Sequence, residues 1–278
     1  MPNNAPIISI RGLTKSFGSQ TVLAGIDLDV LPGEIMVVMG GSGCGKSTLL
    51  RHLIGAVTPD AGSIRLFGRE ITDLDERGLA EVRKRFGILF QSGALINSLT
   101  VGENVALPLR EHTRLDSATI EIMVKIKLEM VGLREHADKM PAQLSGGMKK
   151  RAGLARAIAL DPQLLFYDEP SAGLDPVTSA AIDQLIIALA RKLDVTSVVV
   201  THEMDSAFAI ADRMCMLEKG RVLKIGPRAQ FETLRAAPDP AALAPDEQLI
   251  RQFLRGDPDG PITQRKERTS FAEDLLLT

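Results

Sequence analysis

Short apolar runs recur along the chain and predict buried β-strands. The clearest occur at Glu34–Met39, Gln163–Tyr167 and Thr196–Thr201, each too short for an average helix. Other strands are predicted where turn residues interrupt shorter apolar runs. These are Ile7–Arg11, Thr21–Val30, a hairpin over Thr58–Gly68 that turns at Pro59–Gly62, and a closing hairpin of Cys215–Leu217 with Val222–Ile225.

Segments with helical spacing separate these strands. Asp175 is a favoured N-cap residue and Pro176 a favoured first helical residue, and apolar positions follow them at helical spacing. Because strands alternate with helices, we predict an α/β fold with a mostly parallel sheet covered on both faces. An all-helical stretch at about 97–160 interrupts the alternation and predicts an inserted helical subdomain. The other predicted helices are Lys46–Ile54, Val101–Pro108, Ser117–Val131 and Gly147–Leu160.

The composition shifts near Ala236. Residues 1–235 are predicted to form one large domain, and residues 236–278 a linker and C-terminal tail. Ala236–Pro245 is rich in Ala, Pro and Asp and is predicted to be the linker. Asp246–Leu254 is predicted to be a short amphipathic helix, and the remainder to Thr278 is polar and expected to be irregular.

Composition and charge narrow the class of protein. The chain has 278 residues, 45% of them hydrophobic, and a formal net charge of −2, so bulk charge does not favour nucleic acid as a partner. We interpret the basic clusters Arg83–Arg85 and Lys149–Arg151 as solvated helix faces. Two distant cysteines, Cys44 and Cys215, indicate a reducing, cytoplasmic setting rather than a disulfide framework. The polar start of the chain predicts no secretory signal, and no apolar run is long enough to span a bilayer.

The glycine-rich stretch Gly40–Thr48 matches the P-loop pattern of glycine, four residues, then Gly-Lys-Ser. Its glycines let backbone N–H groups point at phosphate oxygens, and the following helix adds its positive dipole end. A glycine-rich turn without a ligand is the alternative, which the preceding strand and following helix disfavour. The residues expected to contact the nucleotide are Gly40, Gly41, Ser42, Gly43, Cys44, Gly45, Lys46, Ser47 and Thr48, with Lys46 on the terminal phosphates and the Ser47 hydroxyl on Mg²⁺.

Two carboxylates follow the buried strand that ends at Tyr167. Ligands of open α/β sheets bind at this carboxyl edge. Asp168 is therefore predicted to hold Mg²⁺, and Glu169 to orient and polarise the attacking water. Alone, such a run is also typical of a strand that ends in solvated charges. Only together with a P-loop does it indicate a nucleotide site.

A third motif precedes the helix predicted at Gly147–Leu160. Ser145 can cap that helix, while Gly146 and Gly147 leave its N–H groups open to an anion. By itself this is an ordinary capped helix. Its place between the P-loop and the Asp168–Glu169 strand indicates a nucleotide contact instead.

In this order, the motifs resemble the ATPases of ABC transporters over roughly Ile7–Leu234. The resemblance implies a RecA-like P-loop NTPase core with an antiparallel β subdomain, and ATP and Mg²⁺ as cofactors. It also implies that Phe17 stacks on adenine, that Gln91 senses Mg²⁺ and water beside the permease, and that Ser171–Asp175 communicates across a dimer. His202 matches the histidine near the γ-phosphate. The implied catalytic set is Glu169, His202, Gln91 and Lys46, the metal set Ser47, Gln91 and Asp168, and the outlying nucleotide contacts Phe17, Gln91, Ser145, Gly146, Gly147 and Asp175.

Met148 departs from the glutamine that usually ends the signature. With several flanking stretches, it makes the chain similar to the ATPases of Mla phospholipid transport systems, which implies transport between inner and outer membranes that maintains lipid asymmetry. An ABC ATPase for another solute, including toluene-tolerance and Mce-type lipid transporters, remains the alternative. The flanking stretches are Phe90–Leu95, Ser98–Val101, Glu103–Thr113, Tyr167–Gly173 and Phe253–Pro261.

Non-transport ABC ATPases fit less well. Chromosome-maintenance ATPases need a long coiled-coil insertion, for which the interval from Gln91 to Leu144 has no room. Ribosome-associated ABC factors usually carry two cassettes, whereas this chain carries one. The resemblance thus implies a two-fold dimer with a second copy, membrane permease subunits, and the substrate-binding and small regulatory subunits of such systems. It places the protein peripherally on the cytoplasmic face of a bacterial inner membrane, and we expect Leu249–Leu254 and the residues beyond to dock on the partner ATPase and steady the dimer.

Overall fold

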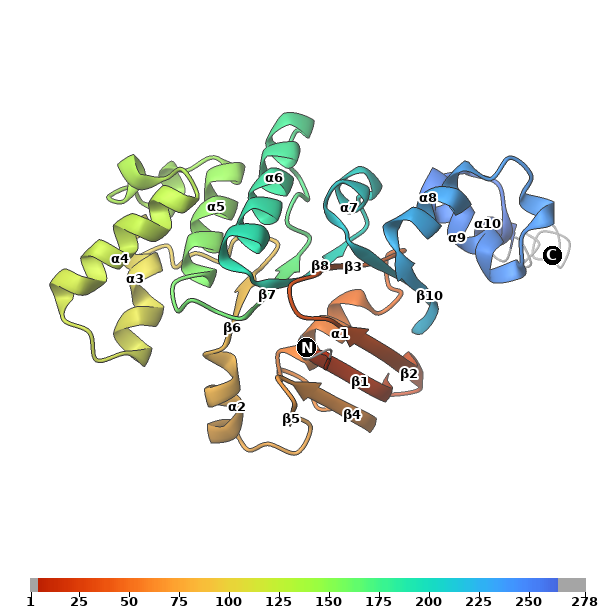
Figure 1. Cartoon of the computed structure of the whole chain (residues 1–278), viewed down its shortest axis with the longest axis horizontal. Coiled ribbons are helices and arrows are strands. Elements are labelled where there is room, and N and C mark those ends of the chain that lie inside the picture. The colour runs from red at the N-terminus through yellow and green to blue at the C-terminus, as the bar shows by residue number, and fades with distance from the viewer. Residues whose placement is uncertain (1–4, 265–278) are drawn as a thin grey trace, which may run out of the picture.

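The computed structural model describes residues 5–264, which contain two β-sheets and a set of helices around them (Figure 1). The larger sheet has the strand order β10-β9-β3-β8-β7-β6, in which only the edge strand β10 runs antiparallel to its neighbour. Its strands are β3 (Ile35–Gly40), β6 (Phe86–Leu89), β7 (Leu164–Asp168), β8 (Thr196–Thr201), β9 (Arg213–Glu218) and β10 (Arg221–Pro227). The predicted α/β fold with a mostly parallel sheet is confirmed.

The smaller sheet is antiparallel and has the order β2-β1-β4-β5, which confirms the expected antiparallel subdomain. Its strands are β1 (Ile8–Phe17), β2 (Gln20–Val30), β4 (Ala61–Leu66) and β5 (Arg69–Glu70). β1 was expected to stop before Gly12, but it continues to Phe17 because a register shift between Ile10 and Leu13 accommodates Gly12 at φ 58°.

The hairpin predicted at Thr58–Gly68 turns at a different place. β4 passes to β5 through Phe67 and Gly68, which have φ values of 54° and 76°, the pair of left-handed residues that a tight hairpin needs. The predicted turn at Pro59–Gly62 instead leads into β4, where the Asp60 N–H donates to Thr14 O at 2.9 Å. The predicted turn position is therefore wrong.

Helices cover both sheets and extend to opposite ends of the molecule (Figure 1). α3, α4 and α5 form the helical subdomain at one end, and α8, α9 and α10 lie at the other. The helices are α1 (Lys46–Leu53), α2 (Glu76–Arg83), α3 (Val101–His112), α4 (Ser117–Met130), α5 (Gly146–Ala157), α6 (Pro176–Leu193), α7 (Met204–Ile210), α8 (Arg228–Ala236), α9 (Pro245–Arg255) and α10 (Pro261–Gln264), with short 3₁₀ turns at Arg134–His136, Pro141–Gln143 and Pro240–Ala242.

Pro108 does not end α3 as predicted. The helix begins with a capping box in which Thr100 and Glu103 satisfy each other's backbone N–H groups. It then runs past Pro108 to His112 because Val105 and Leu109, on either side of the proline, are buried in the core. Packing of these side chains outweighs the hydrogen bond that Pro108 removes.

The parallel sheet divides the core in two. Alternate side chains of β3 point to opposite faces, so that Val37 packs with the helical subdomain and α6, whereas Val38 packs with the antiparallel sheet and α1. In parallel register, Met39 lies beside Thr201, and Asp168 lies beside Val200. Residues that follow β3, β7 and β8 are thereby collected at one edge of the sheet.

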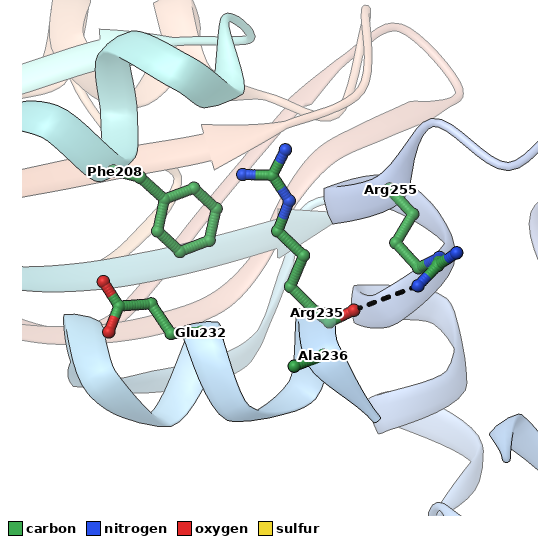
Figure 2. Close-up of a pocket in the computed structure, with 5 residues that line it drawn as sticks. All are labelled: Phe208, Glu232, Arg235, Ala236 and Arg255. Carbon is green, nitrogen blue, oxygen red and sulfur yellow. Dashed lines mark hydrogen bonds between the residues drawn. The ribbon is translucent and has the colours of Figure 1, made fainter. Parts of the chain in front are cut away.

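The C-terminal helix α9 packs on its own chain. Its amphipathic character is as predicted, but Leu249, Ile250 and Leu254 are each 5% exposed or less and belong to the core. Figure 2 shows the pocket where this attachment is visible: Arg255 on α9 donates to the backbone oxygen of Arg235 on α8 at 3.4 Å.

Of the segment expected to dock on a partner ATPase, Leu249, Ile250 and Leu254 are covered by this chain itself, whereas Phe253 is only partly buried; docking of the segment stays a prediction. The predicted linker contains the 3₁₀ turn Pro240–Ala242 before α9, and α10 follows where irregular chain was expected. Residues 265–278 of the predicted tail lie outside the described residues. Within residues 5–264, no helix combines the length and the apolarity needed to cross a membrane.

The start of α5 fits tightly against α6. A Cβ added to Gly147 would lie 2.5 Å from Cγ2 of Thr178, a distance at which one of the two groups must shift. Thr178 is β-branched and helical, so its side chain has little freedom to move away. Gly147 is thus fixed by packing within this chain.

We expect Ile250→Ala to lower the free energy of unfolding by about 2–4 kcal/mol, because the Ile250 side chain on α9 is fully buried in the core. Urea unfolding measures this change. Ile122→Ala is the matched control: Ile122 is 59% exposed on α4, and its loss should cost less than about 0.5–1 kcal/mol. Equal effects of the two substitutions would contradict the packing of α9 described above.

We expect Gly147→Ala to destabilise the protein by about 1–3 kcal/mol through overpacking against Thr178. Thr178→Ala removes the opposing Cγ2, so the double variant should regain most of the lost stability. This double-mutant cycle is measured by thermal and urea unfolding of the two single variants and the double variant. Additive losses would show that the close approach is not the cause.

Candidate functional site

Two glycines of the P-loop, Gly40 and Gly45, lie where no side chain fits. Gly40 has φ 153°, and a Cβ there would lie 2.2 Å from Leu217 O. Gly45 has φ 112°, and its Cβ would lie 2.8 Å from a methyl group of Leu23. The loop therefore passes directly between β9 and β2 before α1 begins, which aims the first N–H groups of α1 into it.

Lys46 and Ser47 open α1 at the end of this loop. Lys46 is only 7% exposed, and its ammonium group donates to Gly40 O at 2.7 Å and to Gly41 O at 3.0 Å. The Lys46 side chain thus folds back along the P-loop and contacts its first two residues. Ser47 is exposed in the first turn of the helix. A cation, open N–H groups and a hydroxyl together suit the phosphates of a nucleotide.

Asp168 ends β7 at the same edge of the sheet. Burial raises the pKa of its carboxyl group, as does the charge of Glu169, while Arg51, Lys150 and Lys46 act in the opposite direction. The positive charge of Lys46 is thus close enough to influence this carboxylate. Asp168 and Ser47 offer oxygen donors, the ligand type that Mg²⁺ prefers.

Glu169 is held by the last residue of the neighbouring strand β8, Thr201, and by His202, which follows it. Its Oε1 lies 2.8 Å from Nδ1 of His202, and its Oε2 accepts from the Thr201 hydroxyl at 3.2 Å and from the His202 N–H at 3.4 Å. The Glu169 side chain is 12% exposed, whereas that of His202 is 57% exposed. The carboxylate is thereby fixed in place, and the imidazole reaches the surface beside it.

Gln91 lies in an exposed turn after β6, and α5 holds the continuation of that turn. Arg156 on α5 donates to Ala94 O at 2.7 Å and to Gly93 O at 3.1 Å. A Cβ on Gly153 would lie 2.8 Å from the same Gly93 O, so the helix and the turn touch. Sequence reasoning missed Arg156, because a helical arginine gives no sign of which loop it bonds.

Phe17 lies at the end of β1 and is 52% exposed, so its ring is available for stacking. The strand end is fixed by Asp60, which accepts from the Lys15 ammonium at 2.8 Å and from the Ser16 N–H at 2.7 Å. The Lys15 ammonium also lies 5.5 Å from the centroid of the Phe17 ring. An exposed aromatic ring beside a cation suits an adenine ring with its phosphates.

Ser145 and Asp175 both cap helices, as predicted. Ser145 Oγ accepts from the Met148 N–H at 3.3 Å, and an Asp175 oxygen accepts from the Val177 and Thr178 N–H groups at 3.0 Å. These bonds hold the pKa of Asp175 below its usual value, those with Thr178 contributing most. Ser145 and Gly146 are exposed at the start of α5, beside the loop that leads into α6.

The structure thus brings Lys46, Asp168, Glu169 and His202 to one edge of the parallel sheet, as the sequence predicted. Phe17 lies on the antiparallel sheet, and Gln91 follows the edge strand β6. Ser145–Gly147 belongs to the helical subdomain, where the neighbours of both glycines are residues of α6 or of the loop before it.

Comparison with known proteins gives matches over nearly the whole chain. The family model described as "ABC transporter" matches residues 23–172. The chain is 42% identical over 272 residues to the intermembrane phospholipid transport system ATP-binding protein MlaF of Escherichia coli, covering 98% of this chain and 97% of that one. It is 43% identical over 272 residues to the probable ribonucleotide transport ATP-binding protein mkl of Mycobacterium leprae, covering 97% and 75%.

Solved structures agree in fold. The dimeric ATP-binding cassette MJ0796, bound to ADP and Pi in a post-hydrolysis state, superposes with a TM-score of 0.74 at 32% identity, covering 80% of this chain and 98% of that one. CbiO1 from Clostridium perfringens, part of the transporter complex cbiONQ, gives a TM-score of 0.76 at 29% identity, covering 83% and 94%. The chain belongs to the ABC transporter family, as a subunit that binds and hydrolyses ATP.

Proposed function

We propose that this protein hydrolyses ATP in a symmetric dimer and thereby powers the transport of phospholipid between bacterial membranes. The observation that carries the catalytic part is the contact of 2.8 Å between Glu169 and His202, at the sheet edge that also bears the P-loop. A carboxylate and an imidazole so paired can orient a water molecule for attack on a terminal phosphate.

Each residue has a distinct task in this proposal. The P-loop N–H groups and Lys46 bind the phosphates and balance the charge that builds up during transfer. Glu169 polarises the attacking water, and His202 binds the γ-phosphate from the solvent side of the carboxylate. Ser47, Asp168 and Gln91 would hold Mg²⁺, which neutralises phosphate charge when it is bound. Phe17 stacks on the adenine ring.

The second half of each site comes from a second copy of the chain. Ser145 and Gly146 are exposed at the N-terminus of α5, the end of a helix that suits an anion. In the proposed two-fold dimer, these residues of one copy face the γ-phosphate held by the P-loop of the other, in an isologous interface. MJ0796, a structural relative at 32% identity, was solved as a dimer with ADP and Pi, which supports this arrangement.

A groove between the sheet and the helical subdomain suits a permease. It encloses about 550 Å³ and is mostly apolar, with a basic rim. Phe90, the residue before Gln91, is 38% exposed there. A short amphipathic segment of a membrane chain would fit such a surface, and it would hold the ATPase on the cytoplasmic face of the inner membrane. The groove is also lined by Leu107, Pro108, His112 and Lys84.

Phospholipid is the cargo that we favour. The MlaF proteins of E. coli and Haemophilus influenzae match this chain along 97% and 99% of their length. The mkl protein, named for ribonucleotide transport, is matched along 75% of its length, so another hydrophobic or polar solute is the second candidate. Mass spectrometry of lipid that co-purifies with the transporter, assembled with its permease and any substrate-binding or regulatory subunit, decides between them. A complex that carries no phospholipid and is stimulated by another solute would overturn the cargo assignment.

We expect Glu169→Gln to retain ATP binding and to lose at least about 100-fold in kcat, because the amide cannot polarise water. Steady-state phosphate release and equilibrium ATP binding measure the two quantities. The variant should also accumulate as an ATP-bound dimer in size-exclusion chromatography. Wild-type turnover by Glu169→Gln would rule out this mechanism.

We expect Phe90→Asp to abolish co-purification with the permease, because it puts a charge into the apolar groove. ATP binding by the isolated chain should change less than about twofold, since Phe90 is outside the phosphate site. Ile126→Asp is the matched control, because Ile126 is also an exposed apolar residue but lies on α4, outside this groove. If Phe90→Asp still assembles like the control, the permease does not use this groove.

A further inference from the structure

Lys150 is buried, although the run Lys149–Arg151 was interpreted as a solvated helix face. That interpretation is wrong for Lys150, which lies on α5 and is 4% exposed. Its ammonium group donates to the backbone oxygen of Glu169 at 2.9 Å. A lysine is rarely buried to this extent without a specific partner, because its charge must be taken out of water.

The partner of Lys150 is a carbonyl group rather than a carboxylate. Among residues 5–264, no ion pair involves the Lys150 ammonium. Burial lowers the pKa of Lys150, and carboxylates further away act against that shift; these belong to Glu203, Asp168 and Glu169. The cation therefore lies near the acidic end of β7, and its one short contact is with the backbone oxygen of Glu169.

Glu169 needs such support. Its φ is 48°, in the left-handed region, which a residue with a side chain adopts only at a cost in backbone energy. The N–H of Glu169 donates to Val200 O at 2.9 Å, which fixes the peptide unit before its Cα. Its carbonyl accepts from Lys150 at 2.9 Å and from the Ala172 N–H at 3.3 Å, which fixes the peptide unit after it.

The strained backbone determines where the carboxylate points. With a positive φ, the side chain of Glu169 is directed to Thr201 and His202 at the end of β8, where three contacts hold it. Relaxation of the backbone would move the carboxylate away from His202. Lys150 thus acts on the geometry of the Glu169–His202 pair without contacting either side chain.

We propose that Lys150 is a positioning residue for Glu169, through which the helix bearing Ser145–Gly147 sets the orientation of the carboxylate that activates water. This inference rests on the role proposed above for Glu169. Lys150 reaches the carbonyl from the middle of α5, five residues after the helix cap at Ser145. Movement of that helix would therefore change the support of Glu169 directly.

The test compares Lys150→Met with Lys150→Arg in the full-length protein, with ATP as the probe. Methionine keeps the apolar stem but cannot donate, so we expect kcat to fall about 10- to 100-fold while KM for ATP changes less than about twofold. Arginine can still donate to the Glu169 carbonyl, and it should restore kcat to within about threefold of wild type. Lys150→Gln, a neutral donor, replaces the arginine variant if that one does not fold.

Lys149→Met is the matched control, because it removes the same charge one position earlier on the same helix, where the side chain is only partly buried. It should leave kcat within about twofold of wild type. Thermal unfolding of every variant shows whether a fall in kcat is accompanied by a loss of stability. A Lys150→Met protein with a lower melting temperature but a wild-type kcat would overturn the inference, as would equal effects at the two lysines.

Failure of this inference is distinguishable from failure of the proposed function. If wild type hydrolyses ATP and Glu169→Gln does not, the proposed mechanism stands whatever the Lys150 variants do. If Glu169→Gln hydrolyses ATP normally, Glu169 does not activate the water, and the positioning role of Lys150 falls with it.

Discussion

The parallel hydrogen-bond register of β3, β7 and β8 is the constraint on which the rest of the site depends. It places Met39 beside Thr201 and Asp168 beside Val200, so the residues after all three strands meet at one edge. Buried apolar side chains on both faces of the sheet hold that register, because a shift by one residue would turn each strand's core side chains to the wrong face. The Glu169–His202 contact is thus a consequence of how the core packs.

Residues whose chemistry is tied to local sequence could be predicted: the glycines before Lys46, and Asp168 with Glu169 after an apolar strand. Residues that act through distant packing could not. The run around Lys150 has the same sequence pattern whether its lysines face solvent or the end of β7, and only the position of α5 decides between these. Similarly, the pattern of α9 predicted a buried face but not which surface covers Ile250.

Two errors in the predicted fold come from local sequence signals that the structure does not follow. Pro59–Gly62 has the composition of a turn, but the chain reverses at Phe67 and Gly68, where a bulky residue takes a left-handed conformation that composition disfavours. Pro108 was expected to end α3, yet burial on both sides of it carries the helix onward. In both cases tertiary packing outweighs local propensity, and neither error displaces a residue of the candidate site.

Helix α5 can be regarded as a rod bonded to two other segments of the chain. Lys150 near its middle donates to the Glu169 carbonyl, and Arg156 near its C-terminal end donates to the turn after Gln91, whereas the Ser145 cap bonds only within the helix. From Ser145 to Arg156 the helix rises about 16 Å, so a tilt of roughly 10° about one end displaces the other by about 3 Å. That displacement is as long as a hydrogen bond. A tilt of this rod would therefore also move Lys150, and with it the hydrogen bond to the Glu169 carbonyl.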